Sequence, residues 1–222
     1  LGIMGLGDML IQLGITYGSQ EAVEFCHQIG FTMANTAIAA SALLAKEQGA
    51  YEMCHVDEIM TTPYFKANAT EETAALVKAH GLRNSQLLTI APTGTLSTML
   101  GISGGIEPIY ANYYERKTES LHAADVYYKV YTPIVATFMK QHGIKDDSKL
   151  PEYFVTALTL HYEERVAMQA AWQEHIDASI SSTVNVPNSF TVEDTERLYM
   201  LAYESGCKAL RYFVMVASVQ AF

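Results

Sequence analysis

The chain has 222 residues, enough to bury a sizeable hydrophobic core. Half of the residues are apolar and 17% are charged, which excludes a disordered chain, and the apolar runs are too short for a membrane span. The net charge of −10 argues against a nucleic-acid-binding surface, because such surfaces need clustered basic residues. We therefore expect a soluble protein whose partners include neither nucleic acid nor a membrane.

Four helices are predicted from apolar residues that recur every three or four positions. Ser19, Thr70 and Thr191 are suited to cap the N-termini of three of them, and a glycine can end each of these three. The predicted helices cover residues 19–49, 70–81, 161–179 and 191–206.

Short apolar or β-branched runs follow the helix-ending glycines and predict strands. The predicted strands are residues 87–90, 106–113, 182–186 and 209–213. Helix and strand in alternation indicate an α/β fold, helix-rich with a short parallel sheet. The sequence contains no repeat, low-complexity tract or linker, so we expect residues 1–222 to form a single domain, with a polar loop at 144–150.

Residues 89–98 read TIAPTGTLST and lie where a predicted parallel strand gives way to a helix. Ligands of α/β proteins bind at this end of the strands. Gly94 lets the backbone approach a ligand closely, and the nearby amides, with the hydroxyls of Thr93, Thr95 and Ser97, are suited to donate to phosphate oxygens. The residues alone also fit a capped turn without a ligand, and composition favours that interpretation.

Residues 80–110, HGLRNSQLLTIAPTGTLSTMLGISGGIEPIY, resemble the large catalytic subunit of ribonucleotide reductases, most of all the adenosylcobalamin-dependent (class II) branch. The shared segments are Arg-Asn-Ser, Ala-Pro-Thr-Gly-Thr and Gly-Ile-Glu-Pro. Three further stretches resemble the family in the same order: LGIMGLGDMLIQLGI at the start, WQEHIDASISSTVNVPN at 172–188 and TVEDTERLYMLAYESGCKAL at 191–210. The resemblance covers nearly the whole chain.

This resemblance implies the C-terminal half of a ten-stranded α/β barrel, whose partner is the remaining N-terminal half. It implies a ribonucleotide substrate, whose 2′-hydroxyl is replaced by hydrogen through thiyl-radical chemistry, and adenosylcobalamin as the cofactor of the parent enzyme. The residues implied to bind the substrate phosphates are Pro92, Thr93, Gly94, Thr95, Leu96 and Ser97.

The radical and redox cysteines of the family have no match here. Cys26, Cys54 and Cys207 are isolated and odd in number, which argues against a disulfide framework or a zinc site and fits a reducing, cytoplasmic compartment. The chain starts at Leu1 without a targeting segment, which indicates a piece of a longer protein. We therefore expect the isolated chain to be inactive and to bind no cofactor alone.

Other polar residues are interpreted as supports. Glu107 either hydrogen-bonds a ligand or braces its own turn, and bracing is favoured. Asn84, with Arg83, is expected to organise the start of the strand behind the loop rather than to touch substrate. His161 and His175 are interpreted as surface or capping residues, not metal ligands. The tyrosines between 110 and 131 are expected to serve packing.

Two alternatives remain open. Related enzymes that use a separate radical-generating subunit carry a tyrosine pair near the end of this region, and Tyr212 matches one member of that pair. A stand-alone nucleotide- or phosphate-binding module, or a scaffold without catalysis, also fits the residues. Because a half-barrel exposes strand edges and an apolar face, the isolated chain is expected to associate, with a homodimer as one form.

Overall fold

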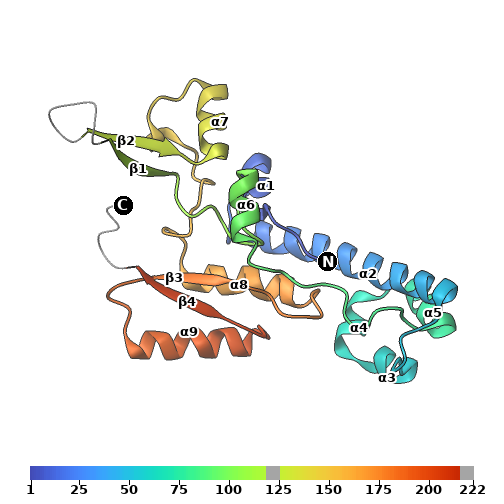
Figure 1. Ribbon diagram of the computed structural model, residues 1–222. Helices are drawn as coiled ribbons and strands as arrows, with labels where there is room; N and C mark the ends of the chain where they lie inside the picture. Colours follow the sequence, from blue (N-terminus) through green and yellow to red (C-terminus); the bar gives the residue numbers. More distant parts are fainter. Residues whose placement is uncertain (119–125, 216–222) are drawn as a thin grey trace.

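The computed structural model describes residues 1–118 and 126–215 (Figure 1). The helices are α1 Leu6–Leu13, α2 Gln20–Gln48, α3 Val56–Thr61, α4 Pro63–Asn68, α5 Glu71–His80, α6 Gly94–Leu100, α7 Pro133–His142, α8 Tyr162–Gln173 and α9 Val192–Glu204, with a short 3₁₀ helix, η1, at Asp147–Lys149. The strands are β1 Tyr113–Thr118, β2 Val126–Tyr131, β3 Thr183–Pro187 and β4 Arg211–Met215. A helix-rich α/β arrangement, as expected, is confirmed.

Three helices begin where their caps predict. The side chains of Ser19, Thr70 and Thr191 each accept the backbone amide three positions on, at the starts of α2, α5 and α9. At α9 the carboxylate of Asp194 also accepts the backbone amide of Thr191 at 2.9 Å, which completes a capping box. These local signals need no tertiary contact, so the sequence was sufficient to predict them.

Helix α8 is shorter than the predicted 161–179, and that prediction of its end was wrong. The Gln173 side-chain amide donates to the carbonyls of Ile176 and Ala178, at 2.9 and 3.0 Å, and so stabilises a turn in place of further helix. The chain beyond this turn runs extended into β3. The early end of α8 thereby places Asp177 beside residues 87–90.

The parallel sheet is smaller than predicted. Strands β3 and β4 pair in parallel across α9, from Thr183 opposite Arg211 to Pro187 opposite Met215, as expected for two of the predicted strands. The other two are not parallel strands, since 87–90 forms no strand and only the last residue of 106–113, Tyr113, lies in a strand, the antiparallel β1. They make only isolated parallel bridges, Ile90 with Ile180 and Ile109 with Thr156.

A side chain takes the place of a strand partner at residues 87–90. The carboxylate of Asp177 accepts the amides of both Leu87 and Leu88 at 2.7 Å. Backbone pairing with the chain after α8 therefore begins just after Asp177, where Ala178 donates to the Leu88 carbonyl at 3.0 Å, and it continues where Ser181 donates to the Ile90 carbonyl at 2.8 Å. The segment is extended and held on both sides, because Leu1 accepts from Thr89 and donates to Leu87.

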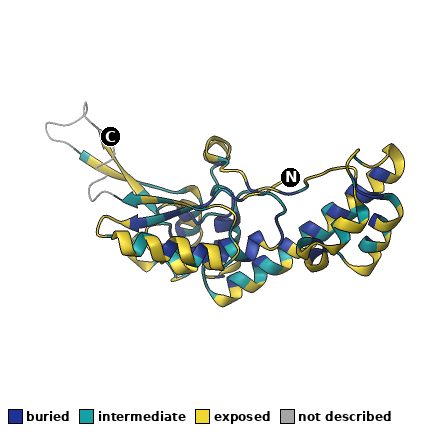
Figure 2. Cartoon of the chain, turned by 90° about the horizontal axis from the view of Figure 1, so that it is seen from below, coloured by how far each residue is buried: buried dark blue, intermediate teal, exposed yellow. Residues whose placement is uncertain are grey.

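The tyrosine-rich region forms an antiparallel hairpin of β1 and β2, which the sequence did not predict. Figure 2 shows this hairpin projecting from the body of the molecule. Tyr113 packs edge-on against Tyr131, with ring centroids 5.8 Å apart, which fits the expected packing role. Tyr114, Tyr127 and Tyr128 are exposed in this chain, so for them packing at an interface stays a prediction.

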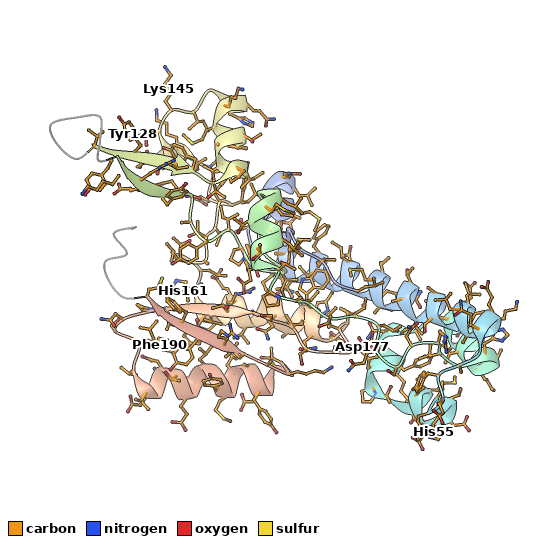
Figure 3. All side chains as sticks on the ribbon, viewed as in Figure 1. His55, Tyr128, Lys145, His161, Asp177 and Phe190 are labelled. Atoms are coloured by element: carbon orange, nitrogen blue, oxygen red, sulfur yellow. The ribbon has the colours of Figure 1, made fainter. Side chains whose placement is uncertain are left out.

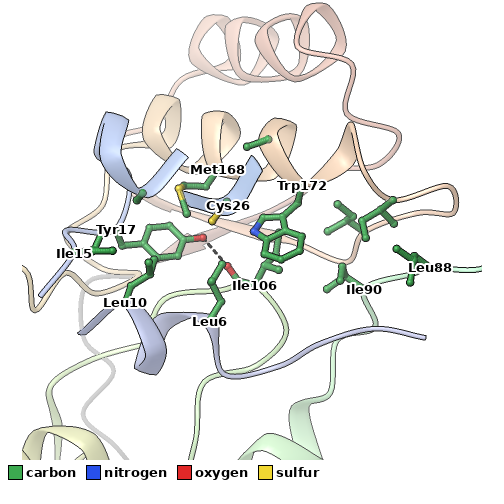
Figure 4. Packing of buried hydrophobic residues seen from close by; sticks show 14 of the residues in the cluster. Leu6, Leu10, Ile15, Tyr17, Cys26, Leu88, Ile90, Ile106, Met168 and Trp172 are labelled. Carbon is green, nitrogen blue, oxygen red and sulfur yellow. Dashed lines mark hydrogen bonds between the residues drawn. The ribbon is translucent and has the colours of Figure 1, made fainter. Parts of the chain in front are cut away.

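The main core lies where α1, α2 and α8 meet the segments that contain Leu88, Ile90 and Ile106. Trp172 on α8 is fully buried at its centre, next to Cys26 of α2 (Figure 4). The buried surfaces of the molecule converge on this region, whereas the outer faces of α9 and of the α3–α5 group are exposed (Figure 2).

By length and composition alone, α2 is apolar enough to cross a membrane. Its buried stripe contains small residues, among them Ala22, Gly30, Ala34 and Ala42, and the helix packs against α5 and α8. Small residues allow such close helix contacts. We therefore interpret α2 as the central core helix of this fold.

Candidate functional site

The TIAPTGTLST stretch forms the predicted turn followed by a helix. Helix α6 begins at Gly94, with Thr93 as its N-cap. Thr93 has φ 51° and ψ 20°, which is the left-handed conformation. No other non-glycine residue that the structure describes has a positive φ. Such a conformation is uncommon for a β-branched residue and is held only where surrounding contacts fix it.

The Thr93 side chain does not cap α6. Its hydroxyl oxygen instead accepts the backbone amide of Gly105 at 3.0 Å, and Gly105 itself has a positive φ of 46°. The amides of Gly94, Thr95 and Leu96 belong to the first turn, where a helix provides no intrahelical acceptors. A Cβ added at Gly94 would meet no atom within 4 Å, so this end of α6 faces open space.

Ser97 differs from the other hydroxyl residues of the loop. It is buried, and its hydroxyl donates to the Gly94 carbonyl at 3.1 Å. Thr98 donates to the same carbonyl at 2.8 Å. The single hydroxyl hydrogen of Ser97 therefore serves the loop itself, whereas Thr95 is exposed and Thr93 is occupied as an acceptor.

Glu107 makes the contacts of a brace. Its Oε1 accepts the amide of Thr183, at the start of β3, at 2.8 Å, and lies 3.5 Å from Nη2 of Arg165. The Glu107 backbone amide donates to the Gly104 carbonyl at 2.9 Å, which closes the turn that receives Thr93. These contacts agree with the favoured bracing interpretation.

Arg165 is a support that the sequence analysis missed. It is 3% exposed, on α8, and donates through Nη1 to the Tyr17 hydroxyl and to the Ile106 carbonyl. Its Nε donates to the Thr183 carbonyl at 3.3 Å, and Tyr17 also donates to Ile106, at 2.6 Å (Figure 4). Burial is the main cause of the raised pKa of Tyr17, so its hydroxyl stays protonated. The available signal was an arginine on the buried face of a helix, since a buried charge needs partners.

Asp8 holds the other side of the same turn. It is buried on α1, and its carboxylate accepts the amide of Ser103 at 2.6 Å while its own amide donates to the Ser103 hydroxyl at 3.4 Å. Residues 101–107, which receive the Thr93 hydroxyl, are thus fixed from α1 and from α8. An aspartate within the apolar run LGDML was the sequence signal for this role.

Asn84 organises the start of the extended segment, as expected, but not the loop. The Ser41 hydroxyl donates to Oδ1 of Asn84 at 3.1 Å and accepts from the Asn84 backbone amide at 3.0 Å. Asn84 lines a cavity of about 240 Å³ together with Tyr64 and Asp177, and residues 92–97 line neither of the two described cavities. Five extended residues, roughly 16 Å, separate the Leu87 edge of this cavity from Pro92.

The three cysteines are held as structural thiols. Burial raises the pKa of Cys26 to about 12 and that of Cys207 to about 11, so neither is a thiolate at neutral pH. The Cys54 sulfur accepts the Leu82 amide at 3.2 Å. That none of the three is the radical or a redox cysteine of the family stays a prediction.

The two histidines singled out in the sequence have different environments. His161 is exposed at the N-cap of α8, as expected. His175 is 5% exposed and contacts His27 and Asn68, so its interpretation as a surface or capping residue was wrong. Its partners come from positions 148 and 107 residues away, which no local pattern reveals.

Comparisons with known proteins agree with this architecture. A family model described as the barrel domain of ribonucleotide reductase matches residues 1–213. A vitamin B12-dependent ribonucleoside-diphosphate reductase of Mycobacterium tuberculosis is 30% identical over 96% of this chain and 30% of that protein. The same-named protein of Thermoplasma acidophilum is 31% identical over 96% of this chain and 28% of its own length.

Among solved structures, the class Id ribonucleotide reductase alpha subunit of Actinobacillus ureae superposes with a TM-score of 0.73 at 23% identity. The match covers 98% of this chain and 39% of that one, and at this identity it shows the fold alone. The chain spans about 30% of the length of the curated relatives named above. By the family match over residues 1–213, the chain belongs to the ribonucleotide reductase barrel-domain family.

Proposed function

We propose that this chain supplies the substrate-phosphate loop of a ribonucleotide reductase, formed by residues 92–97. The observation that carries the proposal is the start of α6, where the Thr93 side chain is bonded to Gly105 and leaves the first-turn amides to a ligand. An anion is favoured there by the amides and by the positive end of the helix dipole. No lysine or arginine lies within the loop, so the backbone provides the attraction.

In this proposal each loop residue has a distinct part. Gly94, Thr95 and Leu96 contribute backbone amides, and the exposed Thr95 hydroxyl adds a donor. Ser97 and Thr93 keep the loop in shape through their bonds to Gly94 and Gly105. Pro92 lies against Gly104, where an added Cβ would come within 3.1 Å of its carbonyl oxygen.

The activity proposed for the whole protein is reduction of ribonucleotides to deoxyribonucleotides by thiyl-radical chemistry. Family membership over residues 1–213 supports it. We propose that the radical and redox thiols come from elsewhere in the protein. The part of this chain is to bind and orient the phosphates. Catalytic groups would come from the N-terminal half of the barrel.

Adenosylcobalamin is proposed as the cofactor of the whole protein, because the two relatives are named as vitamin B12-dependent. The cavity of about 240 Å³ beside Asn84 is smaller than the ~300–1,000 Å³ of pockets that enclose drug-sized ligands, and a corrin is larger still. The described residues therefore do not enclose the cofactor, and we assign it no contact in this chain.

The remaining half of the barrel is proposed as the partner of α6. Leu96, Met99 and Leu100 of this helix are 51%, 74% and 58% exposed. It is unusual for one short helix to expose three large apolar side chains to solvent, and packing against further protein would bury them. The central position of α6 in Figure 1 agrees with that arrangement.

Replacement of Gly94 by aspartate tests the phosphate loop. We expect the KM for the ribonucleotide to rise at least ~10-fold in the intact enzyme, about 1.4 kcal/mol, because the new carboxylate would repel the phosphates. Folding should be unaffected, since the added Cβ meets no atom and an acidic residue suits the first turn of a helix. Steady-state kinetics at varied substrate concentration measures the effect.

Gln141→Asp is the matched control, because it adds the same charge to an exposed position of α7. It should leave KM unchanged. An unchanged KM in Gly94→Asp, with circular dichroism like that of the parent, would remove residues 92–97 from the phosphate site.

A further inference from the structure

A cluster of three side chains with metal-binding atoms lies at the junction of α2 and the end of α8. Nδ1 of His27 is 3.1 Å from Nε2 of His175 and 3.3 Å from Oε2 of Glu174. The ligand atoms of all three residues lie within 4.8 Å of one another. None of the three residues belongs to the proposed phosphate loop, residues 92–97.

The hydrogen bonds of Asn68 fix which His175 nitrogen is free. Asn68 is fully buried, and its Nδ2 donates to the carbonyls of Tyr64 and Glu174 at 3.0 and 2.9 Å. Both amide hydrogens are thus used, so Oδ1 must accept, and it lies 2.6 Å from Nδ1 of His175. The proton of His175 is therefore on Nδ1, and the lone pair of Nε2 points toward His27.

This lone pair faces two further electron-rich atoms, Nδ1 of His27 and the Glu174 carboxylate. A separation of 3.1 Å between Nε2 of His175 and Nδ1 of His27 fits either an N–H of His27 that donates to His175 or a metal ion bound by both nitrogens. Zinc bonds to histidine nitrogen and carboxylate oxygen are about 2.0–2.2 Å, so neighbouring ligands of a tetrahedral ion are roughly 3.3–3.5 Å apart. The two measured separations are close to this spacing.

The surroundings resemble those of a supported metal site. A Cβ on Gly30 would lie 2.6 Å from the His175 ring, so this glycine of α2 makes the space for the imidazole. The bond from His175 to Asn68 is the kind of outer contact that orients a ligating histidine. The side chains of His27 and Glu174 are 40% and 54% exposed, which gives the ion access from solvent.

We propose that His27, Glu174 and His175 bind a Zn²⁺ ion, with the fourth position open to water. Two imidazoles and one carboxylate form a ligand set typical of zinc. The ion would fasten α2 to the turn after α8. Asp177, which holds the amides of Leu87 and Leu88, lies two residues beyond His175, so the ion would also fix the segment that leads into the loop.

Metal titration of the intact protein tests this proposal. After removal of metal by a chelator, Co²⁺ and then Zn²⁺ are added, with visible absorption and metal content by mass spectrometry as readouts. We expect the parent to bind one ion per chain more than His27→Ala, and Zn²⁺ to raise the melting temperature of the parent but not of this variant. Asn68→Ala should weaken binding about 10- to 100-fold.

His55→Ala is the control, because His55 is an exposed histidine at the N-cap of α3 and is not part of the cluster (Figure 3). It should bind like the parent. If His27→Ala does not fold, Glu174→Gln decides the matter, since Glu174 is more than half exposed and its replacement conserves size. Equal stoichiometry and equal affinity in the parent and the folded variant would show that the histidine pair shares only a proton, and would overturn the proposal.

Discussion

Replacement of Arg165 by alanine should destabilise the chain by about 3–5 kcal/mol, the usual cost of removing one partner from a buried ion pair. The guanidinium is 3% exposed and serves acceptors in three different segments, the Tyr17 hydroxyl, the Ile106 carbonyl and the Thr183 carbonyl. Its loss removes a donor from each of these acceptors, although the Ile106 carbonyl still accepts from Tyr17, and it removes the cation from beside Glu107. Urea unfolding, followed by the fluorescence of Trp172, the single tryptophan, measures the change.

Arg165→Lys separates charge from geometry. Lysine keeps the positive charge but cannot direct donors to three acceptors at once, so most of the loss should remain. Glu107→Gln should lower the free energy of unfolding by less than Arg165→Ala does. The Glu107 side chain is 36% exposed, and the side-chain oxygen of the new glutamine can still accept from the Thr183 amide. A lysine variant as stable as the parent would mean that the charge alone, not the fork of hydrogen bonds, joins these segments.

Trp172→Ala should cost about 3–5 kcal/mol, because it leaves a cavity at the centre of the main core. The indole is fully buried among side chains of α1, α2 and α8, and its neighbours are fixed from several elements, so the gap cannot close easily (Figure 4). Urea unfolding monitored by circular dichroism measures the loss, since the variant has no tryptophan.

Trp172→Phe is the matched control. Phenylalanine keeps an aromatic ring in the buried position and removes less volume than alanine does. Its cost should be well below that of alanine. Equal costs for the two variants would indicate that the indole ring does not determine packing at this position.

The sequence predicted those parts of the fold that depend on neighbouring residues. The caps at Ser19, Thr70 and Thr191 act within one helical turn, and the Pro-Thr-Gly-Thr turn is likewise local. The short helix α1 and the β1–β2 hairpin were not predicted, because a short apolar run and a tyrosine-rich run do not select one period. The segment 87–90 has strand composition, yet Asp177, about ninety residues away, takes the amides that a strand would use.

The candidate site shows the same division. The turn and helix start at residues 92–97 could be predicted from a short stretch of chain, whereas the partner of the Glu107 side chain, Thr183, lies 76 residues away. The contacts of Arg165 and Asp8 could not be predicted in this way. Arg165 lies 59 residues from its partner Ile106, and Asp8 lies 95 residues from its partner Ser103. Those two side chains position the turn that receives Thr93, and they act through tertiary contacts only.

The most direct test of the proposed phosphate loop is a crystal structure of the intact protein with a bound ribonucleoside diphosphate. We expect phosphate oxygens within hydrogen-bonding distance of the amides of Gly94, Thr95 and Leu96, with Thr93 still bonded to Gly105. An ordered nucleotide whose phosphates lie elsewhere, with residues 92–97 free of ligand, would contradict the account.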